Sequence, residues 1–174
     1  MSQTSNALPS FISIETGDGA LPVAVAWTLA DGRVKHTLIQ PLESWLEEED
    51  IALGDYDEET LHTLGVRPLD VIRELEADHD GATLYVNGVG EEFEALERLF
   101  DEYSLDPMVE LAPAHQLYDE LDAAQWEDER RKLLDERGLT PLNAEHEVEV
   151  MLLLHQQFAD QLPDDFALDD ESFG

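Results

Sequence analysis

Carboxylate side chains occur at three separated places where they could act together. Ser13 and Glu15 lie two residues apart in the apolar segment "FISIET", so on a strand they would point to the same face. Glu91 and Glu92 begin a segment with helical periodicity. A third group of acids opens the last helical segment, at Glu145, Glu147 and Glu149. If the three segments meet at one end of a sheet, these oxygens would surround a common point.

Such a group of oxygen donors would suit divalent metal ions. Hard cations such as Mg²⁺ take carboxylate ligands, and phosphoryl-transfer sites use several carboxylates around two ions about 4 Å apart. The chain contains 42 Asp and Glu residues, however, so acids fall on many surface helices. For each glutamate the alternative is therefore an ordinary solvated helix face.

The hydrophobic pattern predicts an α/β fold that could carry these positions. Alternating apolar segments predict strands at residues 10–16, 21–30, 33–41, 82–87 and 108–112. Helical spacing predicts helices at 58–64, 67–79, 91–103, 113–121, 123–137 and 143–160. We expect a mixed five-stranded sheet, made of a three-stranded antiparallel meander plus two parallel strands and flanked by helices.

Length and composition set the domain organisation that we expect. The 174 residues suit a single domain over 1–162, and the acidic segment 163–174 is expected to form a disordered tail. No apolar run is long enough to span a bilayer, and the first residues lack the features of a signal peptide. The chain has no cysteine, which excludes disulfides and thiol nucleophiles. A cytoplasmic location without a membrane partner is the expectation.

Charge is the strongest compositional feature. The formal net charge is −33, and only Lys35 and Lys132 are lysines. A field this negative repels nucleic-acid phosphates at low salt. Two interpretations remain open. One is adaptation to high salt, where the Debye length falls to about 3 Å at 1 M and self-repulsion is screened. The other is a protein that imitates nucleic acid or docks on a basic partner.

The layout of three segments resembles a known superfamily. These are "FISIETGDGALPVAVAWTLADGRVKHTLIQP", "GATLYVNGVGEEFEALERLF" and "LTPLNAEHEVEVMLLL", and they resemble the DEDD-type 3′–5′ exonucleases of the ribonuclease-H-like fold. In that family the first strand carries Asp-x-Glu, an Asp opens the helix after the fourth strand, and the last helix carries His-x-x-x-x-Asp. The resemblance implies acids that hold two Mg²⁺ or Mn²⁺ ions and a histidine that acts as general base.

Most of the motif positions depart from that pattern. Ser13 stands where the first Asp belongs, while Glu15 matches the family Glu. Glu92 and Glu147 stand at the other two Asp positions, and Leu142 stands where the histidine belongs. A serine hydroxyl is a poor substitute for a bridging carboxylate, and leucine cannot accept a proton. The candidate metal ligands are therefore Glu15, Glu92 and Glu147, with Ser13 and Leu142 as degenerate positions.

These departures favour a degenerate member of the superfamily, a pseudoenzyme with little or no nuclease activity. It would need no cofactor and would act by binding a protein partner or nucleic acid. The alternatives are an active 3′–5′ exonuclease that uses glutamate ligands with Mg²⁺ or Mn²⁺, and an acidic nucleic-acid mimic. The basic residues of one helix alternate with acids, which predicts ion pairs on a solvated face rather than a nucleic-acid surface: Arg130, Arg131, Lys132 and Arg137.

Overall fold

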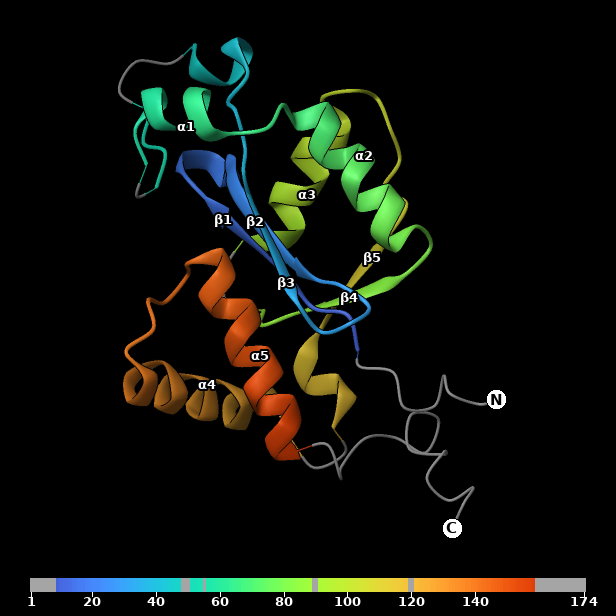
Figure 1. Ribbon diagram of the computed structural model, residues 1–174, viewed down its shortest axis with the longest axis vertical. Coiled ribbons are helices and arrows are strands. Elements are labelled where there is room, and N and C mark those ends of the chain that lie inside the picture. Colours follow the sequence, from blue (N-terminus) through green and yellow to red (C-terminus); the bar gives the residue numbers. More distant parts are fainter. Residues whose placement is uncertain (1–8, 48–50, 55, 89–90, 119–120, 159–174) are drawn as a thin grey trace.

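The predicted antiparallel meander is confirmed. A computed structural model describes residues 9–47, 51–54, 56–88, 91–118 and 121–158 (Figure 1). Strands β1 (Ile12–Thr16), β2 (Pro22–Thr28) and β3 (Val34–Leu38) form an antiparallel sheet in the order β1-β2-β3. The β2–β3 hairpin turns at Gly32, whose φ of 88° lies in the left-handed region that glycine adopts without strain.

The two remaining strands are parallel, as expected, but the single five-stranded sheet that we expected is divided into two sheets. These strands are β4 (Thr83–Val86) and β5 (Glu110–Pro113), which form a separate two-stranded sheet. The two sheets meet at one parallel bridge between Phe11 and Tyr85, where the Tyr85 amide donates to the Ser10 carbonyl at 2.8 Å. The strands therefore lie in the order β3-β2-β1-β4-β5, with β1 next to β4 at this bridge.

Helix boundaries follow from local capping. The helices are α1 (Glu58–Leu64), α2 (Pro68–His79), α3 (Glu92–Asp101), α4 (Ala123–Arg137) and α5 (Ala144–Phe158), with 3₁₀ turns η2 (Asp18–Ala20), η3 (Glu43–Leu46) and η4 (Ala114–Leu117). Asp57 caps α1 by accepting from the Thr60 amide, and Asp122 and Gln125 form a capping box on α4. Gly138, at φ 66°, ends α4 as predicted.

One predicted helix is wrong. Residues 113–121 were expected to be helical, but the described part contains only the short turn η4, because β5 runs on to Pro113. The acidic segment 163–174, for which we expect disorder, lies outside the described residues. Within the described part, no helix has the length and hydrophobicity needed to cross a bilayer.

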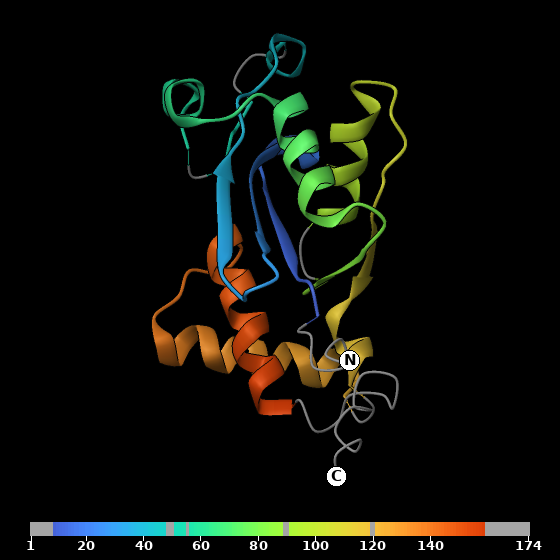
Figure 2. The same ribbon diagram turned by 45° about the vertical axis from the view of Figure 1, so that its right-hand side comes forward.

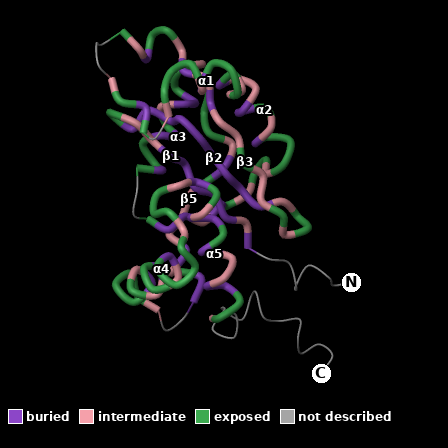
Figure 3. The backbone as a smooth tube through the Cα atoms, turned by 60° about the vertical axis from the view of Figure 1, so that its left-hand side comes forward, coloured by how far each residue is buried: buried purple, intermediate pink, exposed green. Residues whose placement is uncertain are grey.

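Helices cover both faces of the strands (Figure 2). Because side chains alternate along a strand, Ile12 and Ile14 of β1 face one core, together with α2 and α3, while Phe11 faces a second core with α5 and α4. β2 is buried on both faces, with Trp27 in the first core and the small Ala26 against α5. Figure 3 shows these buried strands at the centre of the molecule.

An aromatic group surrounds a buried histidine in the second core. His155 of α5 is 7% exposed, and its Nδ1 lies 2.9 Å from the Tyr118 hydroxyl. Tyr118 stacks on Trp126 at a centroid distance of 5.6 Å, and Phe11 meets the His155 ring edge-on. Burial lowers the pKa of His155 and raises the pKa of Tyr118, because desolvation opposes the charged form of each ring.

The lowered pKa of His155 should make stability depend on pH. An unfolded histidine has a pKa near 6.5, so below about pH 6.5 the unfolded chain gains a proton that the folded chain does not. The free energy of unfolding should therefore fall as the pH drops below about 6.5, until the pH passes the folded pKa.

Replacing His155 should remove this pH-dependent part of the free energy of unfolding. We predict that the stability of wild type relative to His155→Gln declines between about pH 7 and pH 5, measured by urea unfolding at constant ionic strength. The control variant is His36→Gln, which removes an exposed ring from β3 instead of a buried one. A wild-type advantage that stays constant over this range would contradict the prediction.

Candidate functional site: a buried carboxylate network at the end of β1

The three segments that carry the candidate acids meet where β1 ends. Glu15 is 6% exposed, and its Oε1 accepts from the Tyr56 hydroxyl at 3.1 Å and from the Ala144 amide, at the start of α5, at 3.2 Å. The strand register shifts between Glu15 and Thr16. The hydroxyl of Thr16 then donates to Oε1 of Glu91, the N-cap residue of α3, at 3.1 Å. The end of β1 therefore contacts the first turns of both α3 and α5.

The structure buries only some of the candidate positions. Ser13 is 3% exposed and lies opposite Ala26 of β2. Glu92, the first residue of α3, is also 3% exposed. Glu145 and Glu149 are exposed, as the solvated-face alternative requires. For Glu92 and Glu147 that alternative is wrong, because both side chains are buried in the fold.

Glu147 is the best-satisfied acid of the group. It is 1% exposed, and its Oε1 accepts from Arg130 Nε at 2.8 Å and from Asn87 Nδ2 at 2.5 Å. Its Oε2 accepts from Arg130 Nη2 at 2.5 Å and from the Leu142 amide at 2.7 Å. An ionised carboxylate has about four lone-pair sites, so these four hydrogen bonds use its acceptor capacity.

Arg130 is the member of this network whose place the sequence interpretation missed. We expected all the bases of α4 on a solvated face, and the side chains of Arg131 and Lys132 are indeed 64% and 66% exposed. Arg130 is only 4% exposed, because Trp126, Arg130 and Leu134 follow one another at intervals of four along the buried face of α4. That spacing was the available signal. The hydrogen bonds with Glu147 raise the pKa of Arg130 further.

The position expected for a histidine has no polar side chain. Leu142 is 53% exposed, and its φ of 67° places a non-glycine residue in the left-handed region. Its backbone amide, rather than its side chain, contacts the site through the bond to Glu147. Asn143 follows it and caps α5, its Oδ1 accepting from the His146 amide at 3.0 Å.

The donor set does not fit a pair of divalent ions. Two ions need several carboxylate oxygens open to them, but both oxygens of Glu147 accept hydrogen bonds from Arg130, and Ser13 offers only a neutral hydroxyl. Among the described residues, no three His, Cys, Asp or Glu side chains are grouped so that they could hold a metal ion.

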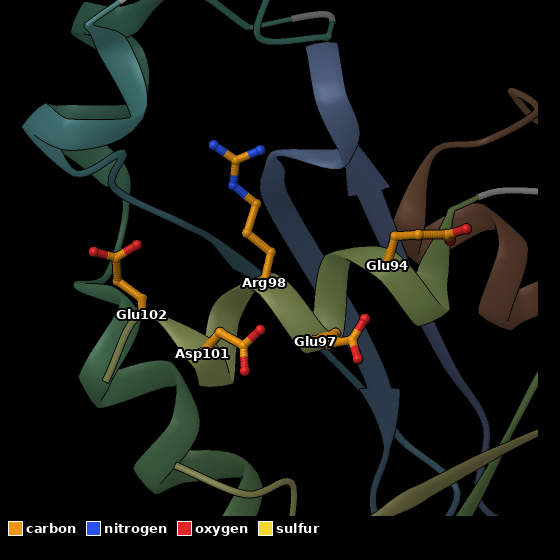
Figure 4. A pocket seen from close by; sticks show the side chains of 5 residues that line it. All are labelled: Glu94, Glu97, Arg98, Asp101 and Glu102. Atoms are coloured by element: carbon orange, nitrogen blue, oxygen red, sulfur yellow. The ribbon is translucent and has the colours of Figure 1, made fainter. Parts of the chain in front are cut away.

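Two hollows lie on the outer side of α3, apart from this network. One, of about 440 Å³, is lined by residues of α3 and by Glu102, which directly follows that helix: Glu94, Glu97, Arg98, Asp101 and Glu102 (Figure 4). The second, of about 260 Å³, lies between Arg98, the η2 turn and η3. Arg98 extends away from Glu97 and Asp101, donates to the Gly19 carbonyl at 2.8 Å and covers the Trp45 ring. Neither hollow is lined by Ser13, Glu15, Glu92 or Glu147.

Comparison with known proteins does not assign a family. No family model matches the chain, and no curated protein sequence matches it. The observations define a mixed α/β protein with a buried, fully hydrogen-bonded carboxylate beside the end of β1.

Asn87 joins β4 to both α4 and α5, and this role can be tested. It follows β4, its Oδ1 accepts from Trp126 Nε1 at 2.8 Å, and its amide donates to Glu147. Asn87→Asp has nearly the same shape but sets a second carboxylate against Glu147. We predict a loss of about 2 kcal/mol or more in the free energy of unfolding, measured by urea denaturation.

The matched control is Asn143→Asp. Its side chain only accepts a hydrogen bond at the start of α5, and aspartate caps a helix as well as asparagine does. The control should change stability by less than about 0.5 kcal/mol. Equal losses in the two variants would show that Asn87 does not act through its amide donor.

Proposed function

We propose that this chain is an exonuclease-fold protein of the ribonuclease-H-like class whose two-metal site is degraded, and that it acts by binding a partner. The strand directions support the fold, because three antiparallel strands precede two parallel ones, with β1 beside β4. Helices on both faces are also as the resemblance implies. The segments that resemble the three motifs lie on β1, on α3 and on α5.

One observation supports the proposed loss of nuclease activity. The ends of β1, α3 and α5 converge, as a metal site of this class requires, but two of the converging positions have side chains of the wrong type. Ser13 is buried where a bridging carboxylate belongs, and Leu142 is exposed where a base belongs. The positions therefore support the scaffold of a nuclease without its chemistry.

The missing groups account for a large loss of rate. A positioned general base contributes roughly 10²–10⁴-fold to a reaction, and leucine cannot replace it. A neutral hydroxyl at the bridging position would weaken the binding of both ions, since hard cations depend on anionic oxygens. Hydrolysis of a phosphodiester should therefore be near background.

A nuclease assay tests this directly. Wild-type protein with Mg²⁺ or Mn²⁺ should degrade single-stranded DNA and RNA no faster than the same preparation with EDTA, at low salt and in molar salt. The control is Glu15→Gln, which removes the acid that matches the resemblance. Metal-dependent degradation that disappears in Glu15→Gln would mean that the chain is the active exonuclease and that the proposal is wrong.

The hollow on α3 favours a second candidate, an acidic nucleic-acid mimic. Four of its five lining residues are acids, and the fifth, Arg98, is engaged with Gly19 and Trp45. A mimic would bind a basic protein, and the affinity would fall steeply with salt because the charges are exposed.

Salt and charge variants separate the two candidates. For a mimic, a partner retained at about 0.1 M salt should be released near 1 M, where screening is strong. Retention should also fall in the combined variant Glu94→Gln, Glu97→Gln and Asp101→Asn. The matched control is Glu145→Gln with Glu149→Gln, which removes exposed acids from α5 instead. Retention that survives molar salt and the α3 changes would exclude the mimic.

A further inference from the structure

A positively charged side chain occupies the centre of the carboxylate network. Arg130 uses three of its nitrogens on two acids: Nε and Nη2 donate to the two oxygens of Glu147, and Nη1 donates to both oxygens of Glu127. Both groups of the inner pair are buried, with side-chain exposures of 5% for Arg130 and 2% for Glu147. This is the bidentate arrangement in which a guanidinium binds a carboxylate most strongly.

The pair holds three elements of the fold together. Arg130 belongs to α4 and Glu147 to α5, while Asn87 follows β4 and completes the acceptor sites of Glu147. Trp126, one turn before Arg130, donates to Asn87 in turn. The polar atoms named here therefore find partners within the protein itself.

The carboxylate of Glu147 is almost completely withdrawn from water. Removing it from water is costly unless a cation and further hydrogen bonds compensate. That cation can be a bound metal ion or a side chain. Arg130 is suited to the task because a guanidinium stays protonated at all ordinary pH values.

We propose that the guanidinium of Arg130 is a built-in replacement for a divalent cation at Glu147, and that it makes this part of the fold independent of metal. The inference rests on the proposed function, since it explains how a degraded metal site keeps a buried acid. It follows that the position at Glu147 is closed to divalent ions in the wild type and opens to them when the guanidinium is removed.

Three variants test the inference: Arg130→Met, the double variant Arg130→Met with Glu147→Met, and the surface control Arg131→Met. Methionine keeps an apolar stem of similar length without charge. Each Tm is measured in EDTA, in millimolar Mn²⁺ and in NaCl of matched ionic strength. Because the surface is acidic, the Mn²⁺-induced rise in the Tm of each variant is compared with the rise in the Tm of the wild type.

We expect Arg130→Met to lower the Tm by roughly 10 °C in EDTA, because it leaves a buried carboxylate without its cation. Mn²⁺ should then raise the Tm of Arg130→Met by several degrees more than that of the wild type, since a bound ion stabilises the folded state by linkage. The double variant should be more stable than Arg130→Met and should show no excess rise. Arg131→Met should behave as the wild type does.

Two results would overturn the inference. One is an Mn²⁺-induced rise in Arg130→Met no larger than in the double variant, which would leave Arg130 as a structural ion pair only. The other is a wild-type rise larger than that of the double variant, since Glu147 would then accept a metal beside Arg130. If Arg130→Met is unfolded in EDTA, the recovery of its helical circular dichroism on adding Mn²⁺ is measured instead of the Tm. If Arg130→Met does not recover although the double variant folds, the inference is likewise overturned.

If neither Met variant folds, an NMR experiment on the wild type tests the inference. Substoichiometric Mn²⁺ should leave the NMR signal of Arg130 Nε–H sharp while exposed amides broaden, and selective broadening of Arg130 would overturn the inference. The outcomes also separate this inference from the proposed function. Metal-dependent nuclease activity in the wild type would refute the proposed function, whereas the comparison between Arg130→Met and the double variant refutes or supports the role of Arg130 alone.

Discussion

The buried ion pair between Arg130 and Glu147 is the interaction on which the site end of the molecule depends. It links α4 to α5, and through Asn87 it links both helices to the end of β4. Removing one partner of a buried ion pair costs much more stability than replacing both partners with apolar residues, because the remaining charge stays in a poorly solvated place. The first turn of α5 is therefore held in position by electrostatics as well as by its apolar contacts with the sheet.

The same turn also receives the end of β1. Glu15 accepts the amide of Ala144, so a carboxylate from the sheet satisfies a backbone donor at the start of α5. β1 can supply this acid because its alternation sends Ile12 and Ile14 into one core and leaves Phe11, Ser13 and Glu15 for the opposite face. The convergence of these segments thus serves helix capping and internal pairing.

The ion pairs in the interior of the protein differ from those on its surface. The interior pair is bidentate and nearly free of water, whereas surface pairs such as Arg131 with Asp128 have side chains about two-thirds exposed. Exposed pairs contribute only about 0–1 kcal/mol each and weaken with salt. With 42 acids and 9 bases, most surface acids have no base to pair with. The net charge of −33 therefore acts mainly on solvent, salt and partners rather than on the fold.

The sequence by itself determined most of the elements, though not the turn η4 where it predicted a helix, because strand alternation, the helical period and the caps Asp57 and Gly138 are local signals. The resemblance to a nuclease pattern also singled out Ser13, Glu15 and Leu142 as motif positions. Only the tertiary structure decided that Arg130 pairs with Glu147, 17 residues away, and that Glu92 and Glu147 are buried rather than on solvated faces. Burial and partner choice depend on which helix faces meet, and local patterns in the sequence do not reveal those long-range contacts.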